Sequence, residues 1–151
     1  MGSSRLSDVE ARAWQALLHA HHDVVEALDR ELRDAHGITF GEYDVLLRLG
    51  RAPDRALRMS DLADRVMLSA SGVTRLVDRL AVRGLLERRT EPADARVALA
   101  SLTIEGSRLL RRAARTHHLG IRTHFTSRLT EAQLRAVAAG LEQVAGPHEP
   151  H

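Results

Sequence analysis

The hydrophobic period of this chain changes at Gly84, and this change limits how its middle can fold. Before Gly84, the stretch LSASGVTRLVDRL at residues 68–80 places its apolar residues within one arc of about 100° on a helix. These apolar residues are Val73, Leu76, Val77 and Leu80. After Gly84, residues 85–90 and 97–102 are two short runs with period-two character, separated by the charged, proline-containing segment 91–96. The sequence therefore predicts a helix followed directly by a β-hairpin whose tip is residues 91–96.

Helical spacing and capping signals predict further helices on both sides of this segment. Thr39 and Thr130 each precede a Glu or Gln by three residues, which is the spacing of a capping box, and Ser60 and Thr103 are also placed as N-caps. Residues 57–59 are expected to be a short extended link. The expected helices cover residues 11–35, 40–50, 61–66, 104–125 and 131–144. The fold class predicted is mainly α with a small β-hairpin.

Two helices joined by a short turn and followed by a hairpin form the winged helix-turn-helix arrangement, here within residues 37–102. The major groove of B-DNA is about 12 Å wide, so a helix enters it only where the side chains at its leading end are short. Four small residues, whose hydroxyls and amides can bind phosphate or base edges, meet this need: Ser69, Ser71, Gly72 and Thr74. Arg75 and Arg79 are long enough to reach guanine or the DNA backbone. Asp78 is expected to direct these two arginines.

The predicted hairpin carries its own basic residues. Arg88 and Arg89 lie on its first strand and Arg96 at its expected tip, where cations could enter the minor groove or hold its phosphates. Asp94 is interpreted as orienting an arginine, because phosphate would repel a carboxylate that faced it. The sequence thus predicts double-stranded DNA as the partner.

Composition excludes several other classes of protein. No apolar run approaches the roughly 18 residues that span a bilayer, so no membrane partner is expected. The polar start predicts no signal peptide, and the absence of cysteine excludes disulfides and thiol chemistry, which together favour the cytoplasm. No nucleophile elbow, phosphate loop or dinucleotide-binding turn is present, so the chain is not expected to be an enzyme. Net charge is only +2, and lysine is absent; a GC-rich coding bias would also replace lysine by arginine.

The segment LADRVMLSASGVTRLVDRLAVRGLLERRTEPADAR and the following LTIEG, within residues 62–106, resemble the MarR family of bacterial transcription regulators. The matching features are a Ser/Thr-Arg reading helix, Gly-Leu-Leu-Glu-Arg, an Asp-x-Arg wing and Leu-Thr-x-x-Gly. Ala95 stands where the commoner wing has another arginine. The resemblance implies a regulator, expected to be a repressor, that binds a pseudo-palindromic operator as a homodimer. It places Ser69, Ser71, Thr74, Arg75 and Arg79 on the reading helix and Asp94 and Arg96 on the wing motif. With Gly72 and Arg89 added from the residues themselves, these form the predicted DNA-binding site.

A homodimer is also expected from the apolar surface of the outer helices, which exceeds what a small winged module can cover. The predicted organisation is one intertwined domain. Its parts are a flexible N-terminus at 1–10, a dimerisation helix at 11–36, the winged module at 37–102, dimerisation helices at 103–145 and a disordered tail at 146–151.

The resemblance implies a small aromatic or anionic effector between the outer helices and the winged module. The candidate pocket residues are Trp14, His21, His22, Tyr43 and His117. No cofactor and no metal are expected, because the histidines form adjacent pairs and not the i, i+4 spacing of a zinc site. A winged-helix module that docks proteins and does not bind DNA remains the alternative.

Overall fold

The first helix, α1 (Asp8–His36), begins and ends at residues with suitable caps. The computed structural model describes residues 5–66 and 70–145. Ser7 Oγ accepts from the backbone N–H of Glu10 at 3.3 Å, and the Glu10 carboxylate accepts from the Ser7 N–H at 2.7 Å. This capping box makes residues 8–10 helical, so the prediction that they are flexible was wrong. Gly37 follows the helix with φ +66°, a left-handed conformation that favours glycine.

The predicted capping box at Thr39 and Glu42 is confirmed, and it opens α2 (Phe40–Arg51). After α2 come a single 3-10 turn, η1 (Pro53–Arg55), a strand, β1 (Ala56–Arg58), and α3 (Met59–Val66). The prediction that Ser60 caps this helix was wrong. Arg58 is still paired with Leu99 in the sheet, so the strand runs directly into α3 and places Ser60 inside its first turn.

The helix and hairpin predicted around Gly84 are confirmed as α4 (Ala70–Val82), β2 (Leu86–Glu91) and β3 (Asp94–Leu102). The strands β2 and β3 form an antiparallel sheet with β1, in the order β1-β3-β2. The predicted tip was too long, because both strands continue into residues 91–96 and leave only Pro92 and Ala93 between them. A register shift between Thr90 and Glu91 accommodates this extension of the ladder.

The remaining helices are α5 (Ile104–His124) and α6 (Glu131–Glu142), joined by the 3-10 turn η2 (Thr126–Arg128). Thr103 Oγ1 accepts from the Gly106 N–H at 3.0 Å, which confirms it as the cap of α5. The capping box of Thr130 and Gln133 is confirmed as well. No helix in the part of the chain that the structure describes has the length and apolarity needed to cross a membrane.

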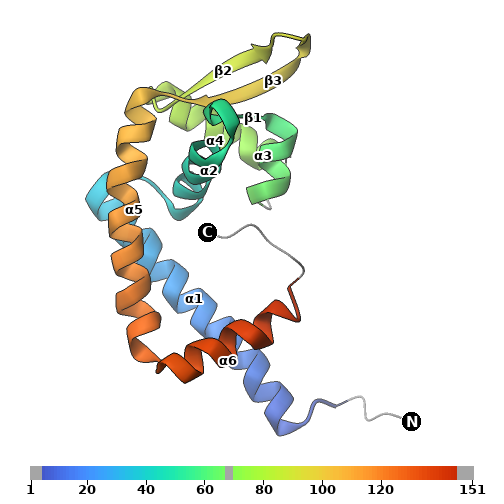
Figure 1. Cartoon of the computed structure of the whole chain (residues 1–151), viewed down its shortest axis with the longest axis vertical. Helices are drawn as coiled ribbons and strands as arrows, with labels where there is room; N and C mark the ends of the chain where they lie inside the picture. Colours follow the sequence, from blue (N-terminus) through green and yellow to red (C-terminus); the bar gives the residue numbers. More distant parts are fainter. Residues whose placement is uncertain (1–4, 67–69, 146–151) are drawn as a thin grey trace. The chain divides into compact units, whose positions relative to one another are not determined.

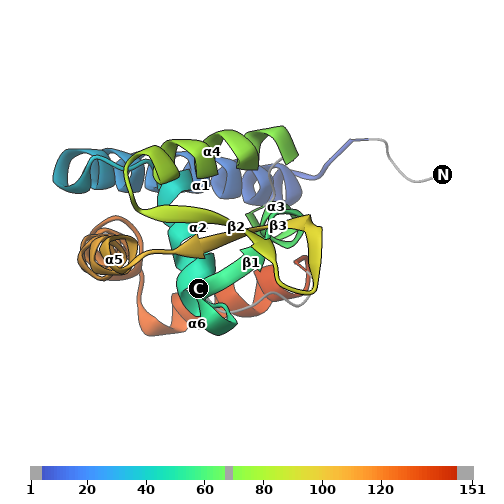
Figure 2. The ribbon, with the colours of Figure 1, turned by 90° about the horizontal axis from the view of Figure 1, so that it is seen from above.

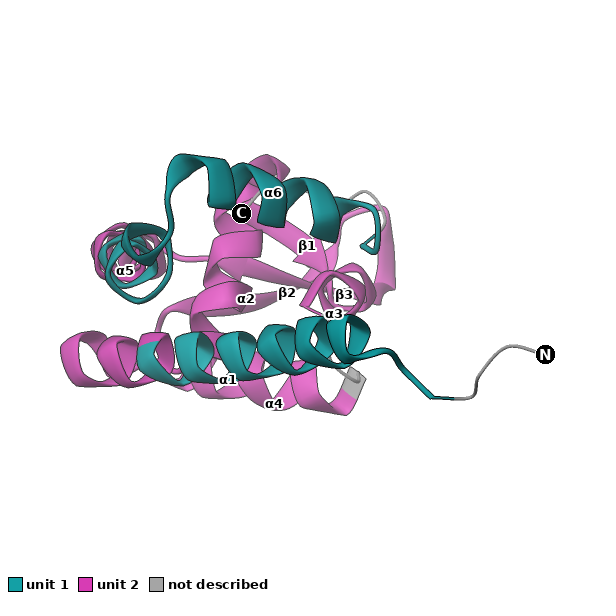
Figure 3. Cartoon of the chain, turned by 90° about the horizontal axis from the view of Figure 1, so that it is seen from below, with its two compact units in different colours: residues 1–27, 118–151 teal, residues 28–117 magenta. Residues whose placement is uncertain are grey.

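Figure 1 shows the helices and strands in chain order, and Figure 3 shows that the chain divides into two compact units, residues 28–117 and residues 1–27 with 118–151. The unit of residues 28–117 contains the sheet and the core, and within it α4 packs against α2, α3 and β2 (Figure 2). Together α3, α4 and the β2-β3 hairpin form a winged helix-turn-helix, as predicted. The largest of the fully buried side chains are Leu32, Ile38, Val45, Leu46, Leu49, Leu62, Val73, Val77 and Leu80.

Gly106 is expected to be essential for the seating of α5 on the winged module. A Cβ at this position would lie 2.1 Å from the backbone carbonyl oxygen of Leu85, which cannot move away as a flexible side chain could. Gly106→Ala should therefore lower the free energy of unfolding by about 1–3 kcal/mol. Gly41→Ala is the matched control, since its Cβ meets only ordinary contacts at 3.8 and 3.9 Å. Urea unfolding followed by circular dichroism measures both; equal stability of the two variants would contradict the clash.

Candidate nucleic-acid interface

Helix α4 has one buried side and one outward side, as its periodicity predicted. Val73, Leu76, Val77 and Leu80 are all buried. On the outward side Ser71, Arg75, Asp78 and Arg79 are exposed, and Gly72 and Thr74 are half-buried. Ser69, also predicted to contact DNA, lies outside the described residues. The outward side thus has small residues near its N-terminal end and long basic residues further along.

The two arginines of this outward side differ in their partners. Within residues 5–66 and 70–145, no group forms a hydrogen bond or ion pair with the guanidinium of Arg75, which is therefore available to an external acceptor. Arg79 Nε instead lies 3.3 Å from Oε1 of Glu42, a buried carboxylate of α2. The guanidinium of Arg75 is thus without a partner among the described residues, whereas that of Arg79 is paired with α2.

The expectation that Asp78 directs Arg75 and Arg79 was wrong. Its Oδ1 lies 3.1 Å from Nε of Arg88 on β2, so Asp78 connects α4 to the hairpin. Arg88 therefore faces α4, while Arg89 falls on the opposite face because side chains alternate along a strand. The ion pair of Asp78 and Arg88 therefore links α4 to β2 and lies between the outward side of α4 and the hairpin.

The hairpin arginines are all paired with carboxylates. Arg89 Nη2 lies 2.7 Å from Glu87 Oε2, and Arg58 of β1 reaches Glu91 at 2.8 Å. Arg96 lies within β3 and not at the hairpin tip as predicted, yet its side chain is 90% exposed.

Asp94 orients Arg96, as predicted. Its Oδ1 accepts from both the backbone N–H of Arg96, at 3.0 Å, and its Nε, at 3.1 Å. The side-chain hydrogen bond, with a smaller effect of the backbone one, lowers the pKa of Asp94 below its usual range. Asp94 therefore remains charged at neutral pH and keeps the guanidinium of Arg96 extended from the sheet.

The residues predicted to line an effector pocket belong to two different units. Tyr43 and His117 lie in one unit with ring centroids 4.5 Å apart, and burial raises the pKa of Tyr43, so its phenol stays neutral. Trp14, His21 and His22 belong to the other unit, where all three are exposed on α1. Among residues 5–66 and 70–145, no three His, Asp or Glu side chains gather as metal ligands would.

Sequence reasoning missed Glu42 as a partner of α4. Its position three residues after Thr39 indicated a capping box, and that function is confirmed. The same carboxylate also pairs with Arg79, which is 37 residues away in the chain. The spacing of residues within one helix cannot predict a contact between two helices that are this far apart in sequence.

Comparison with known proteins places this fold in a family. A sequence model of the MarR family matches residues 36–97. The HTH-type transcriptional regulator MhqR of Bacillus subtilis is 27% identical over 105 residues, 70% of each chain. Among solved structures, AbsC of Streptomyces coelicolor has a TM-score of 0.87 at 28% identity, covering 94% of this chain and 95% of AbsC.

A second structure from Streptomyces coelicolor, Sco3205, was solved in complex with DNA. It has a TM-score of 0.88 at 31% identity, covering 95% of this chain and 89% of Sco3205. These relatives are transcriptional regulators and not enzymes, in agreement with the prediction from sequence. Similarity over nearly the whole of both chains extends the match beyond the winged module to the flanking helices. The chain belongs to the MarR family of transcriptional regulators.

Proposed function

We propose that this protein is a sequence-specific, homodimeric repressor that reads a pseudo-palindromic operator with α4 in the major groove. The observation that carries the proposal is the outward side of α4. Small residues near its N-terminal end allow close approach to the groove, and the exposed Arg75 has no acceptor among the described residues. The crystal structure of the similar protein Sco3205, which was determined in complex with DNA, supports DNA binding by this fold.

The β2-β3 hairpin is proposed to contact the DNA backbone or the neighbouring minor groove. Asp78 and Arg88 hold the hairpin to α4 through a 3.1 Å ion pair, so that helix and hairpin can bind together. Arg96 is extended and exposed, which suits a phosphate contact better than base reading.

Replacement of Arg96 by alanine should weaken binding to all DNA sequences about equally. Each copy of the dimer would lose one phosphate contact, so the slope of log K against log salt concentration should fall by about two for the whole complex. Arg96→Lys is the control, because it keeps the charge and should largely keep the slope. Fluorescence anisotropy at several salt concentrations measures both variants. A change in the preferred sequence would contradict this assignment and make the hairpin a reader of bases.

The second copy of the chain is proposed to cover apolar side chains of residues 5–27 and 118–145. These include Trp14, whose exposed fraction is 56%, and Leu18 at 47%. The other exposed apolar residues of these segments are Leu6, Val9, Leu17, Leu119, Val137, Leu141 and Val144. A surface of this kind is normally covered by a partner, and two-fold pairing would present two α4 helices to two half-sites.

Release of the operator by a small aromatic acid is a further part of the proposal. Tyr43 and His117, whose rings are in contact, would form one wall of the pocket. Trp14, His21 and His22 of α1 stay candidate ligand-binding residues. Benzoate is a suitable probe in the same anisotropy assay. Operator affinity that does not change with benzoate would count against a pocket for aromatic acids.

Selection of bound sequences from random duplex DNA tests the central proposal. Enrichment of a palindrome with half-sites about ten base pairs apart is expected, because a two-fold dimer places its reading helices one helical turn apart. Absence of enrichment would contradict DNA reading and favour the use of the winged module for docking proteins.

A further inference from the structure

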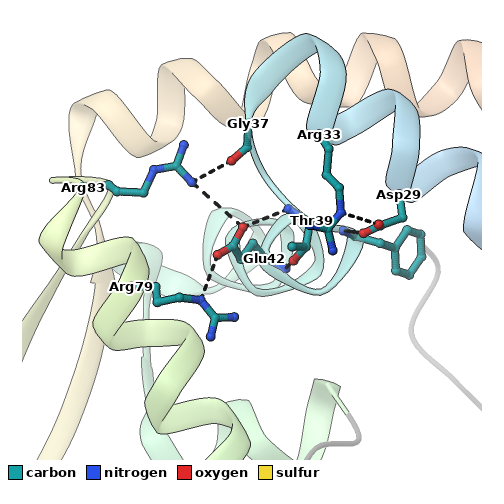
Figure 4. A network of polar contacts seen from close by, with 8 residues as sticks. Asp29, Arg33, Gly37, Thr39, Glu42, Arg79 and Arg83 are labelled. Carbon is teal, nitrogen blue, oxygen red and sulfur yellow. Dashed lines mark hydrogen bonds and ion pairs between the residues drawn. The ribbon is translucent and has the colours of Figure 1, made fainter.

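Glu42 lies where α1, α2 and α4 come together. Its side chain is buried, and each carboxylate oxygen has a different partner (Figure 4). Oε2 accepts from the backbone N–H of Thr39 at 2.8 Å, and Oε1 lies 3.3 Å from Nε of Arg79. Nη1 of Arg83 lies 3.9 Å from Oε2 and donates to the Gly37 carbonyl at 3.0 Å. One carboxylate thus joins the start of α2 to the second half of α4.

The burial of Glu42 makes these contacts more than surface ion pairs. A buried carboxylate is costly unless cations and hydrogen-bond donors surround it, so Arg79 of α4 and Arg83, which follows α4, stabilise Glu42 in its buried position. Asp29 adds to the same region, since its Oδ1 accepts from the backbone N–H of Phe40 at 2.7 Å. The start of α2 is therefore fixed to α1, and α4 is fixed to the start of α2.

The two arginine contacts restrain the rotation of α4 about its own axis. Arg83 directly follows α4, and its backbone N–H donates to the Arg79 carbonyl at 3.3 Å, so it lies one turn beyond Arg79 on the same side of the helix. A single contact would leave the helix able to turn about it. Arg75 precedes Arg79 by four residues and therefore lies on the same stripe. A small rotation of α4 would move the guanidinium of Arg75 sideways across a base pair.

We propose that Glu42 is a positioning residue for DNA recognition, which sets the orientation of α4 through Arg79 and Arg83 and so aims Arg75. This inference rests on the proposed function, in which α4 reads the operator. It assigns Arg79 to the support of the reading helix and not to a base. Arg79 and Glu42 both line a cleft of about 730 Å³. The cleft gives the side chain of Arg79 room to move away when glutamine replaces Glu42.

Glu42→Gln is the central test variant. Glutamine can accept from the Thr39 N–H and so keeps the capping box, but it lacks the charge that holds Arg79 and Arg83. The specificity ratio, meaning operator affinity divided by affinity for unrelated duplex DNA at one salt concentration, is expected to fall about tenfold. Affinity for unrelated DNA should not fall, because the protein loses a negative charge.

Asp44→Asn is the matched control. Asp44 is also an ion-paired carboxylate of α2, but its partner is Arg48 of the same helix at 3.2 Å. This variant changes net charge by the same amount without touching α4, so its specificity ratio should equal that of the unchanged protein. Circular dichroism in the absence of DNA should show the same helix content for both variants.

A double-mutant cycle separates positioning from base reading. If Arg79 acts through Glu42, Glu42→Gln combined with Arg79→Gln should lower the ratio no further than either change alone. Additive losses, or an unchanged ratio for Glu42→Gln, would overturn the inference. If Glu42→Gln fails to fold, Arg83→Gln replaces it in the cycle with the same expectation. Failure of the unchanged protein to prefer any operator would instead overturn the proposed function.

Discussion

Replacement of Arg75 by alanine is expected to lower affinity for each half-site of the selected operator by about 5- to 150-fold, which corresponds to about 1–3 kcal/mol per half-site. Arg75 is exposed on the outward side of α4 and has no acceptor among the described residues. Its guanidinium is thus available for a bidentate contact with guanine. Affinity for unrelated DNA should fall much less, since there the side chain supplies only one charge.

Two further variants distinguish base reading from charge alone. Arg75→Lys keeps the positive charge but cannot form the planar two-bond contact, so most of the loss in operator affinity should remain. Arg111→Ala removes an exposed arginine of α5 and should change the affinity for the operator little. Competition titrations with operator and unrelated duplexes measure all three. If Arg75→Ala bound the operator as the unchanged protein does, Arg75 would not be a reader.

The seating of the reading helix could be predicted from sequence because it depends on local spacing. Four apolar residues at helical intervals were enough to identify the buried side of α4, and all four are buried. Capping boxes at Thr39 and Thr130 were equally local signals. The box of Ser7 and Glu10 has the same spacing and could have shown that α1 begins at Asp8.

The partners of the charged side chains could not be predicted in the same way. Arg79 with Glu42 and Arg88 with Asp78 join different elements, and which carboxylate meets which arginine depends on how those elements pack. Asp78 lies next to Arg79 in the chain, which suggested a local pair. On a helix, however, neighbours in sequence point about 100° apart, so Asp78 and Arg79 face different directions. Asp78 instead pairs with Arg88 of β2 at 3.1 Å.

The apolar surface of residues 5–27 and 118–145 leads to the prediction with the largest effect. Leu18→Glu should convert the dimer to a monomer, because it places a charge among side chains that the second copy would cover. Leu18 is 47% exposed, so the change should not remove a core contact within one chain. Operator affinity should then fall by about 10²- to 10⁴-fold, since the two half-sites would no longer be bound by linked modules.

Ile104→Glu is the control for this variant. Ile104 is 71% exposed, lies in the other unit, and begins α5, where a negative charge is favourable. It should leave both the mass measured by sedimentation and the operator affinity unchanged. With Leu18→Glu, sedimentation should give the mass of one chain, and the full palindrome should bind no more tightly per site than an isolated half-site. A dimeric Leu18→Glu with full operator affinity would show that the second copy covers a different surface.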